Sequence, residues 1–366
     1  MVNIVKDSTA SGVKWMVRWR APDGTQRKKR GFAKKIDAEN WAADNVTSAK
    51  AAGDYVDPRA GRTKCGDIYE RWFESHRPIW KPSYTVDVDA AWRNHLSGKL
   101  ADRAISGVRH SEIQAIVSDI ASRRSASVTL RCFTIVKGIW QTAGSDGIIR
   151  SMRAVENISL PRKPSRKENR HYLTVPQLVR LADQCGRYRT LVLTLGLCGL
   201  RWGEAAALRP DDIDVNAGRI HVRRNVTKAG TQWVEGSPKS WEMRDVPIPA
   251  KLSPLLAAAK FGVRHDDRVF TDPDGHVLRN QTVGRGAAGW WIRALNAAGL
   301  EPMPPHDLRH TAASIAISSG ANVKAVQRML GHKSAAMTLD TYADLFDADL
   351  EMVAERVSER LPALAV

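Results

Sequence analysis

Apolar and basic positions alternate near the start of the chain. Between residues 14 and 20, tryptophan and valine occupy every second position and arginine occupies positions between them, as expected for a strand with one buried face. Pro-Asp-Gly at 22–24 supplies a turn, a basic run at 25–30 supplies a second strand, and a helix around Trp41 follows. Residues 1–58 are therefore predicted to form a small three-stranded β-sheet with one helix.

Helical periodicity replaces this alternation in the middle of the chain. Helices are predicted at 65–76, 84–96, 110–122 and 126–143. The stretches 53–63 and 160–169 are rich in Pro, Gly or charge and lack apolar periodicity, which is typical of linkers. We therefore expect an all-helical domain over residues 64–160.

The largest predicted domain covers residues 170–366. It begins and ends with helical patterns, and strand-like alternation appears at 219–226 and 232–246. This order predicts a mainly helical domain with a small antiparallel sheet. The whole chain is thus expected to be a multidomain α+β protein.

The net charge of the chain indicates what kind of partner it binds. The net charge is +17 and the pI is near 10.0, so polyanions are the natural partner. The excess is spread over all three predicted domains, which suggests that each touches a phosphate backbone. The first strands hold the candidate DNA-binding residues; they form either a ribbon that enters a major groove or a solvated face. These residues are Arg18, Arg20, Arg27, Lys28, Lys29 and Arg30.

The cysteines and apolar runs indicate where the chain resides. Cys65, Cys132, Cys185 and Cys198 show no metal-binding or paired spacing, which fits a reducing cytoplasm. The longest apolar run, Leu191 to Leu200, is about half the length of a membrane span, and the N-terminus lacks a signal-peptide pattern. We expect neither secretion nor insertion into a membrane.

Candidate chemistry begins with two basic residues of the last domain. In Gly-Leu-Arg-Trp-Gly-Glu, a helix starting near Arg201 places Glu204 three residues later, where its carboxylate can hold the guanidinium. A surface ion pair would have the same spacing. Lys239 lies in a turn between two predicted strands, where it is either solvated or a mobile cation delivered to a site.

Histidines of the last domain add to the candidate catalytic residues. Two prolines force a helix to begin near His306, so His306 and Arg309 share a face. His306 and His310 also have the i, i+4 spacing of metal ligands, but the metalloprotease pattern needs a glutamate where this chain has aspartate, which argues against zinc.

Gly331 is a typical helix terminator, and it places His332 just beyond a helix end, where the ring can face a cleft. Tyr342 follows ten residues after His332. For a lone tyrosine, packing in the core is the competing interpretation. Two arginines, two histidines, a lysine and a tyrosine nevertheless suit phosphoryl transfer without a metal, because guanidinium groups offset phosphate charge and a tyrosine oxygen can form a covalent intermediate.

The segments His-Asp-Leu-Arg-His-Thr, Leu-Gly-His-Lys-Ser and Thr-Tyr, in this order, resemble the C-terminal signature of the tyrosine recombinase (phage integrase) family. Gly-Leu-Arg-x-x-Glu resembles its first arginine motif, and Lys239 lies where the family keeps a hairpin lysine. Trp202 departs from the aliphatic residue common there. Upstream, the basic sheet and helical domain are similar in layout to integrases of the lambda type.

The resemblance implies a role for each site residue. Tyr342 would attack the scissile phosphate and form a 3′-phosphotyrosyl link, while Arg201, Arg309 and His332 hold the phosphate oxygens. His306 would assist proton transfer, Lys239 would protonate the leaving 5′-oxygen, and Glu204 would support Arg201. No metal, ATP or other cofactor is implied.

The expected function is integration of a phage genome at DNA attachment sites, together with the reverse excision. The partners implied are double-stranded DNA, further copies of the chain in a tetramer on DNA, a host DNA-bending protein and an excisionase. An apolar stripe at Leu350, Val353, Val357 and Leu361 would pack within its own subunit or on a neighbour. A type IB topoisomerase and a non-catalytic DNA-binding regulator are the alternatives.

Overall fold

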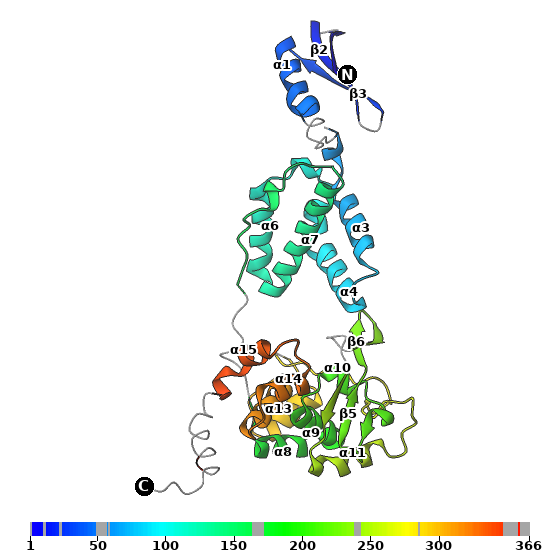
Figure 1. The fold of residues 1–366 in the computed structure, drawn as a ribbon, viewed down its shortest axis with the longest axis vertical. Coiled ribbons are helices and arrows are strands. Elements are labelled where there is room, and N and C mark those ends of the chain that lie inside the picture. The colour runs from blue at the N-terminus through cyan, green and yellow to red at the C-terminus, as the bar shows by residue number, and fades with distance from the viewer. Residues whose placement is uncertain are drawn as a thin grey trace. The chain divides into compact units, whose positions relative to one another are not determined.

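The computed structural model divides the chain into two compact units, residues 1–164 and 165–366 (Figure 1). The division falls inside the stretch 160–169 that was predicted to be a linker. Each unit has its own hydrophobic cores, so each is considered by itself. The structure describes residues 2–9, 12–21, 24–48, 57, 59–162, 172–237, 243–284, 286–346 and 358.

A three-stranded antiparallel sheet opens the first unit, as predicted. Its strands are β1 (Val2–Thr9), β2 (Gly12–Arg20) and β3 (Gln26–Phe32), with β2 in the middle. Helix α1 (Lys35–Ala42) and a following π-helical turn (Ala43–Thr47) cover one face of the sheet. A small core lies between them, made of Val17, Trp19, Ala38, Ala42 and Val46.

A helical bundle forms the rest of the first unit, and its long helix α7 packs against α3, α4 and α6 (Figure 1). The bundle has a core of its own that includes Trp72 and Trp140. The elements are α3 (Cys65–His76), α4 (Pro82–Ala91), a π-helical turn (Trp92–Leu96), α5 (Ser97–Leu100), α6 (His110–Arg123), α7 (Ala126–Ser145) and short 3-10 turns at Ala60–Arg62, Ile105–Gly107 and Arg153–Val155.

The predicted linker 53–63 extends too far into this bundle. Residues 60–62 form a 3-10 turn, and the Ser106 hydroxyl donates a 2.8 Å hydrogen bond to the Gly61 carbonyl. A Cβ atom at Gly61 would lie 2.8 Å from the Ser106 Cβ, so only glycine allows this approach. A buried glycine at a close contact therefore looked like a linker residue in the sequence.

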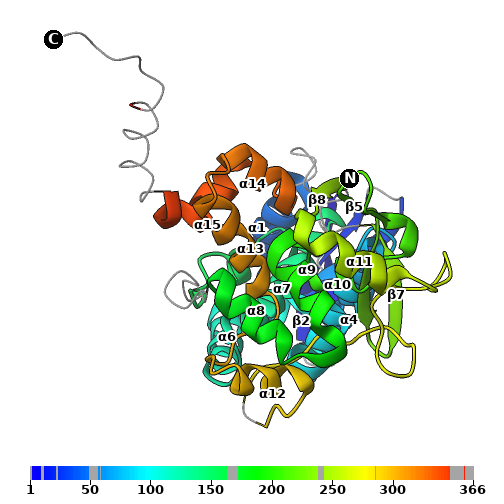
Figure 2. The ribbon, with the colours of Figure 1, turned by 90° about the horizontal axis from the view of Figure 1, so that it is seen from below.

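The second unit is built around α9 (Arg189–Cys198), most of whose residues are buried. Helices α8, α11 and α13 pack on it (Figure 2). The other helices of the unit are α8 (Val175–Asp183), α10 (Trp202–Ala205), α11 (Ser253–Lys260), α12 (Trp290–Ala297), α13 (Asp307–Ser318), α14 (Val323–Leu330), α15 (Ala335–Phe346) and the 3-10 turns Gly186–Tyr188, Pro210–Asp212 and Ala250–Leu252.

Two small antiparallel sheets complete this unit. The strands β4 (Ile213–Asp214), β5 (Arg219–Val222) and β8 (Arg244–Pro247) form one sheet, and β6 (Asn225–Ala229) and β7 (Gln232–Gly236) form the other. The α+β class predicted from the sequence is confirmed.

The single strand predicted at 219–226 is wrong, because it breaks between β5 and β6. At the break, Arg223 and Arg224 both reach the buried carboxylate of Asp212, at 4.0 and 2.6 Å. Successive side chains of a continuous strand point to opposite faces, so they could not both reach it.

Two sequence predictions lie outside the described residues. Lys239 belongs to the undescribed stretch 238–242, and the apolar stripe from Leu350 to Leu361 belongs to the C-terminal tail. Both remain predictions. Among the residues that the structure does describe, no helix is long and apolar enough to cross a membrane.

Candidate active site

The corner between α9 and α10 positions the first arginine. Gly199 ends α9 with a left-handed backbone, and Arg201 caps the start of α10. The Arg201 backbone N–H and Nη1 donate to the two carboxylate oxygens of Glu204, at 2.9 and 2.8 Å. Because the Glu204 side chain is fully buried, this pair is part of the interior and not a surface ion pair.

Arg244 is a second partner of this carboxylate that the sequence reasoning missed. From the start of β8 its Nη1 and Nη2 donate to the Glu204 oxygens at 3.1 and 2.7 Å, and its Nε donates to the Met329 carbonyl at 3.0 Å. Burial by itself would raise the pKa of Glu204, but the hydrogen bonds and charge of Arg244, with the charge of Arg201, outweigh it and lower the pKa to about 2. Glu204 therefore stays ionised and holds two arginines.

Arg309 is the most enclosed cation of the site. It lies on α13 with 3% of its surface exposed, and its guanidinium donates to the Gly199 carbonyl at 2.6 Å and to the Leu330 carbonyl. Burial and the nearby Arg201 charge lower its pKa to about 9, which still leaves it charged at pH 7. One guanidinium thus joins the ends of α9 and α14.

His332 follows the predicted helix terminator. Gly331 ends α14 with a left-handed backbone at φ 64°, and Arg201 Nη2 donates to its carbonyl at 3.3 Å. The His332 Nδ1 shares a 3.0 Å hydrogen bond with the Thr338 hydroxyl. Burial, followed by the charges of the three site arginines, lowers the pKa of His332 to about 4, so the ring is neutral at pH 7.

Tyr342 lies in the same cluster. It is 1% exposed, and its ring is nearly parallel to that of His332, with 6.4 Å between centroids. Its backbone departs from helical dihedrals within α15, at φ −131° and ψ 19°. The side chain also belongs to a buried apolar cluster with Ala313 and Leu330, so Tyr342 packs in a core and contacts the His332 ring as well.

The two histidines of α13 lie at different depths. His306 caps the helix start and is exposed, while His310 is half-buried and its Nδ1 shares a 2.8 Å hydrogen bond with the Tyr342 hydroxyl. Their rings meet edge-on, with centroids 5.4 Å apart. The sequence pattern indicated His310 only as a possible metal ligand, and its contact with the tyrosine was not predicted.

Trp202, the departure from the family pattern, fits its surroundings. Its indole N–H donates to the Leu278 carbonyl at 3.1 Å, and its ring stacks near Trp290. The larger side chain is therefore accommodated at the edge of the main core without disturbing Arg201.

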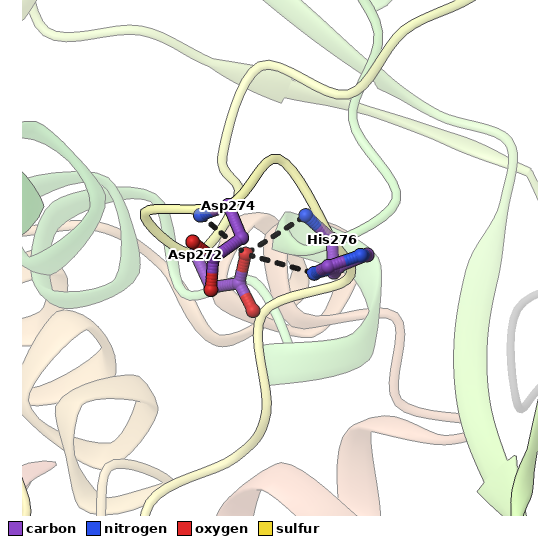
Figure 3. A group of neighbouring side chains, drawn as sticks. All are labelled: Asp272, Asp274 and His276. Atoms are coloured by element: carbon purple, nitrogen blue, oxygen red, sulfur yellow. Dashed lines mark hydrogen bonds and ion pairs between the residues drawn. The ribbon is translucent and has the colours of Figure 1, made fainter.

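Asp272, Asp274 and His276 form a group with metal-ligand types in the second unit (Figure 3). The Asp272 carboxylate accepts the backbone N–H groups of Asp274 and His276 at 3.1 and 2.8 Å, within a turn closed by a bridge between Thr271 and Val277. These bonds give the carboxylate a turn-stabilising role. The group includes none of the arginines or histidines described above.

The basic residues of the N-terminal sheet divide between its two faces. Arg18 pairs with Lys28 across β2 and β3, and strand alternation puts both, with Arg20, on the face away from α1. Arg30 also lies on this side, beside Met16. Lys29 and Arg27 do not lie on this face. The Lys29 ammonium is 4.4 Å from the centroid of the Trp41 ring, and Arg27 forms an ion pair with Asp57 at 3.1 Å.

Comparison with known proteins adds an independent finding. Residues 171–349 match the model of the phage integrase family. Across 343 residues the chain is 25% identical to a protein assigned as a prophage phiRv2 integrase of Mycobacterium tuberculosis, covering 89% of this chain and 88% of that protein. It is 24% identical to the ICEBs1 integrase of Bacillus subtilis, covering 77% and 79% respectively.

Solved structures share the fold. The Tn1549 transposon integrase, bound to a circular intermediate DNA, matches 79% of this chain and 99% of that chain with a TM-score of 0.65 and 20% identity. The lambda integrase tetramer on a Holliday junction matches 90% and 96% with a TM-score of 0.58 and 15% identity.

Proposed function

We propose that this chain, which belongs to the phage integrase family of tyrosine recombinases, integrates mobile DNA by using Tyr342 as its nucleophile. The observation that carries the assignment is the position of the buried Tyr342, whose ring contacts that of His332 and whose charge would act on the guanidinium of Arg309. DNA cleavage and rejoining by the tyrosine mechanism is the activity of the family, and the residue roles below are our proposal.

The arginines stabilise the phosphate during attack. Negative charge grows on the non-bridging oxygens as the tyrosine oxygen approaches, and guanidinium groups offset it through paired hydrogen bonds. Glu204 keeps Arg201 in place, while the carbonyls of Gly199 and Leu330 hold Arg309. Because these partners are already formed, the cations need little reorganisation when DNA binds.

His332 is proposed to donate a hydrogen bond to a phosphate oxygen. Its low pKa makes the neutral ring the working form, and a neutral imidazole still carries one N–H donor. Lys239 is proposed to protonate the leaving 5′-oxygen, with His306 assisting proton transfer. The product is a 3′-phosphotyrosyl link and a free 5′-hydroxyl, so the bond energy is kept for rejoining without ATP.

The N-terminal sheet is proposed to hold a second DNA site. Its face away from α1 gathers Arg18, Arg20, Lys28 and Arg30, and basic side chains of this kind can contact phosphates or base edges in a major groove. A chain that grips one DNA site with the sheet and another with residues 64–366 would bridge them. Removing residues 1–58 should then spare cleavage of a core site and impair integration of a full attachment site.

Assembly on DNA follows from the same proposal. The related lambda integrase forms a tetramer on a Holliday junction, and we propose a tetramer for this chain on two paired sites. The stripe from Leu350 to Leu361 is the proposed contact to a neighbouring subunit. A host DNA-bending protein and an excisionase are proposed further partners, in the cytoplasm of a bacterial host.

Covalent trapping tests the assignment. A pool of nicked duplexes with a randomised central segment is incubated with the protein, and complexes that survive detergent are recovered and sequenced. The wild type should trap a defined DNA sequence, and Tyr342→Phe should trap none while it still shifts the recovered duplex in a gel.

A trapped complex with Tyr342→Phe would overturn the role of Tyr342. Absence of any covalent complex with the wild type would favour a non-catalytic regulator. A topoisomerase would reseal single duplexes but would not join strands of two separate recovered duplexes, so a strand-exchange assay separates that alternative.

A further inference from the structure

A tyrosine nucleophile needs a group to take its proton. A phenol has a pKa near 10, so Tyr342 would attack a phosphate only as its O–H proton leaves. The acceptor must lie within hydrogen-bond reach of the oxygen. His310 meets this condition, because its Nδ1 lies 2.8 Å from the Tyr342 Oη.

His332 is the other imidazole beside Tyr342, and its geometry suits proton acceptance less well. Its Nδ1 shares a hydrogen bond with the Thr338 hydroxyl, and its ring is nearly parallel to the tyrosine ring, with centroids 6.4 Å apart. Burial and the three arginine charges also lower its pKa to about 4, which makes it a weak base. A donor role toward phosphate fits His332 better.

The position of His310 on α13 favours the role of base. It is half-buried and directly follows Arg309, so the helix that places a phosphate-binding cation also places the histidine. The exposed His306 lies edge-on to the His310 ring, with 5.4 Å between the centroids.

We propose that His310 is a catalytic residue that accepts the Tyr342 proton during DNA cleavage and returns it during rejoining. The inference rests on the proposed function of Tyr342. Before reaction the His310 proton sits on Nε2, so Nδ1 accepts the hydrogen bond from the tyrosine. As the Oη–P bond forms, the proton moves to Nδ1, the bond from phosphorus to the 5′-oxygen breaks, and the leaving oxygen takes a proton from Lys239. Rejoining reverses each transfer.

His310→Asn tests the proposal, because an asparagine oxygen can occupy the Nδ1 position and accept a hydrogen bond but cannot accept a proton at neutral pH. With the nicked duplex recovered by covalent trapping, we expect the rate of covalent complex formation to fall roughly 10²- to 10⁴-fold. Duplex binding should stay unchanged in a gel shift. The exposed His265 provides the matched control, and His265→Asn should cleave at the wild-type rate.

A substrate with sulfur in place of the bridging 5′-oxygen identifies which proton transfer is affected. A thiolate leaves without being protonated, so this duplex restores the cleavage rate of variants that lack the acid for the leaving group. It does not restore the rate of variants that lack the base for the nucleophile. His310→Asn should stay slow on it, whereas Lys239→Ala should recover.

Recovery of His310→Asn on the sulfur substrate would overturn the proposal, as would a wild-type rate on the ordinary duplex. Slow cleavage by His310→Ala with normal cleavage by His310→Asn would also overturn it, because the hydrogen bond alone would then suffice. None of these results tests the proposal that Tyr342 is the nucleophile. That proposal is wrong if Tyr342→Phe still forms the covalent complex.

Discussion

The guanidinium of Arg244 donates hydrogen bonds to both carboxylate oxygens of Glu204, at 3.1 and 2.7 Å, in the interior of the second unit. Arg201 donates to the same carboxylate, so one buried anion pairs with two cations. Through Met329, Arg244 also ties the strand β8 to the end of α14 just before Gly331 and His332. This link connects the start of β8, which follows the chain segment that contains Lys239, to the proposed phosphate-binding residues.

Glu204→Gln should destabilise the second unit by roughly 3–5 kcal/mol at pH 7, because it leaves two enclosed arginines without their counter-charge. Urea unfolding of the full chain, followed by hydrogen exchange in peptides from residues 172–237, measures the loss. The exposed pair of Glu74 and Arg77 provides the control, and Glu74→Gln should change stability by less than about 1 kcal/mol.

The lowered pKa of Glu204 predicts how the free energy of unfolding depends on pH. The Glu204 pKa is lowered from 4.5 to about 2 on folding, so its contribution is complete above pH 4.5 and is lost as the pH falls toward 2. The shift corresponds to roughly 3 kcal/mol. The stability difference between the wild type and Glu204→Gln should therefore narrow over this range, and a constant difference from pH 5 to pH 2 would contradict the buried ion pair.

Arg309→Lys should lower the rate of covalent complex formation by roughly 10²- to 10³-fold, although the positive charge is kept. An ammonium cannot bond the Gly199 and Leu330 carbonyls and still present a planar pair of donors to phosphate. Arg180→Lys, an exposed change in α8, serves as the control. EDTA should leave wild-type cleavage unaffected, and metal dependence of the cleavage step would contradict the proposed chemistry.

The two faces of the N-terminal sheet should respond differently to charge removal. Arg18→Ala with Lys28→Ala should weaken DNA binding and reduce the slope of log affinity against log salt by about 2, because two phosphate contacts are lost. Lys29→Ala should leave that slope nearly unchanged, since its ammonium lies over the Trp41 ring. Fluorescence polarisation at several salt concentrations gives both slopes, and equal changes for the two variants would refute the assignment of faces.

Gly138 and Gly144 of α7 form a matched pair for the helical bundle. A Cβ at Gly138 would lie 2.4 Å from the Trp72 ring, whereas one at Gly144 would meet only the Met152 sulfur at 3.8 Å. Gly138→Ala should therefore cost roughly 1–3 kcal/mol through overpacking. Gly144→Ala should stabilise by about 0.5–1 kcal/mol through helix propensity. Thermal unfolding of both variants checks the opposite signs.

The sequence by itself determined the helices of the bundle and the motifs, because these depend on signals carried by neighbouring residues. Helical periodicity predicted the bundle helices. Gly331 predicted both the end of α14 and the position of His332 just beyond it. The order of Arg201, His306, Arg309, His332 and Tyr342 was sufficient to suggest the family. No packing information was needed for any of these.

Only the tertiary structure decided which side chains meet. Arg244 and Glu204 lie 40 positions apart, and His310 and Tyr342 lie 32 apart, so no local pattern relates them. These surroundings set the chemistry, because two arginines make the Glu204 carboxylate a stronger acid in spite of its burial, whereas burial and three arginines make His332 a weaker base. A pKa depends on the surrounding charges in space, and the fold alone brings those charges together.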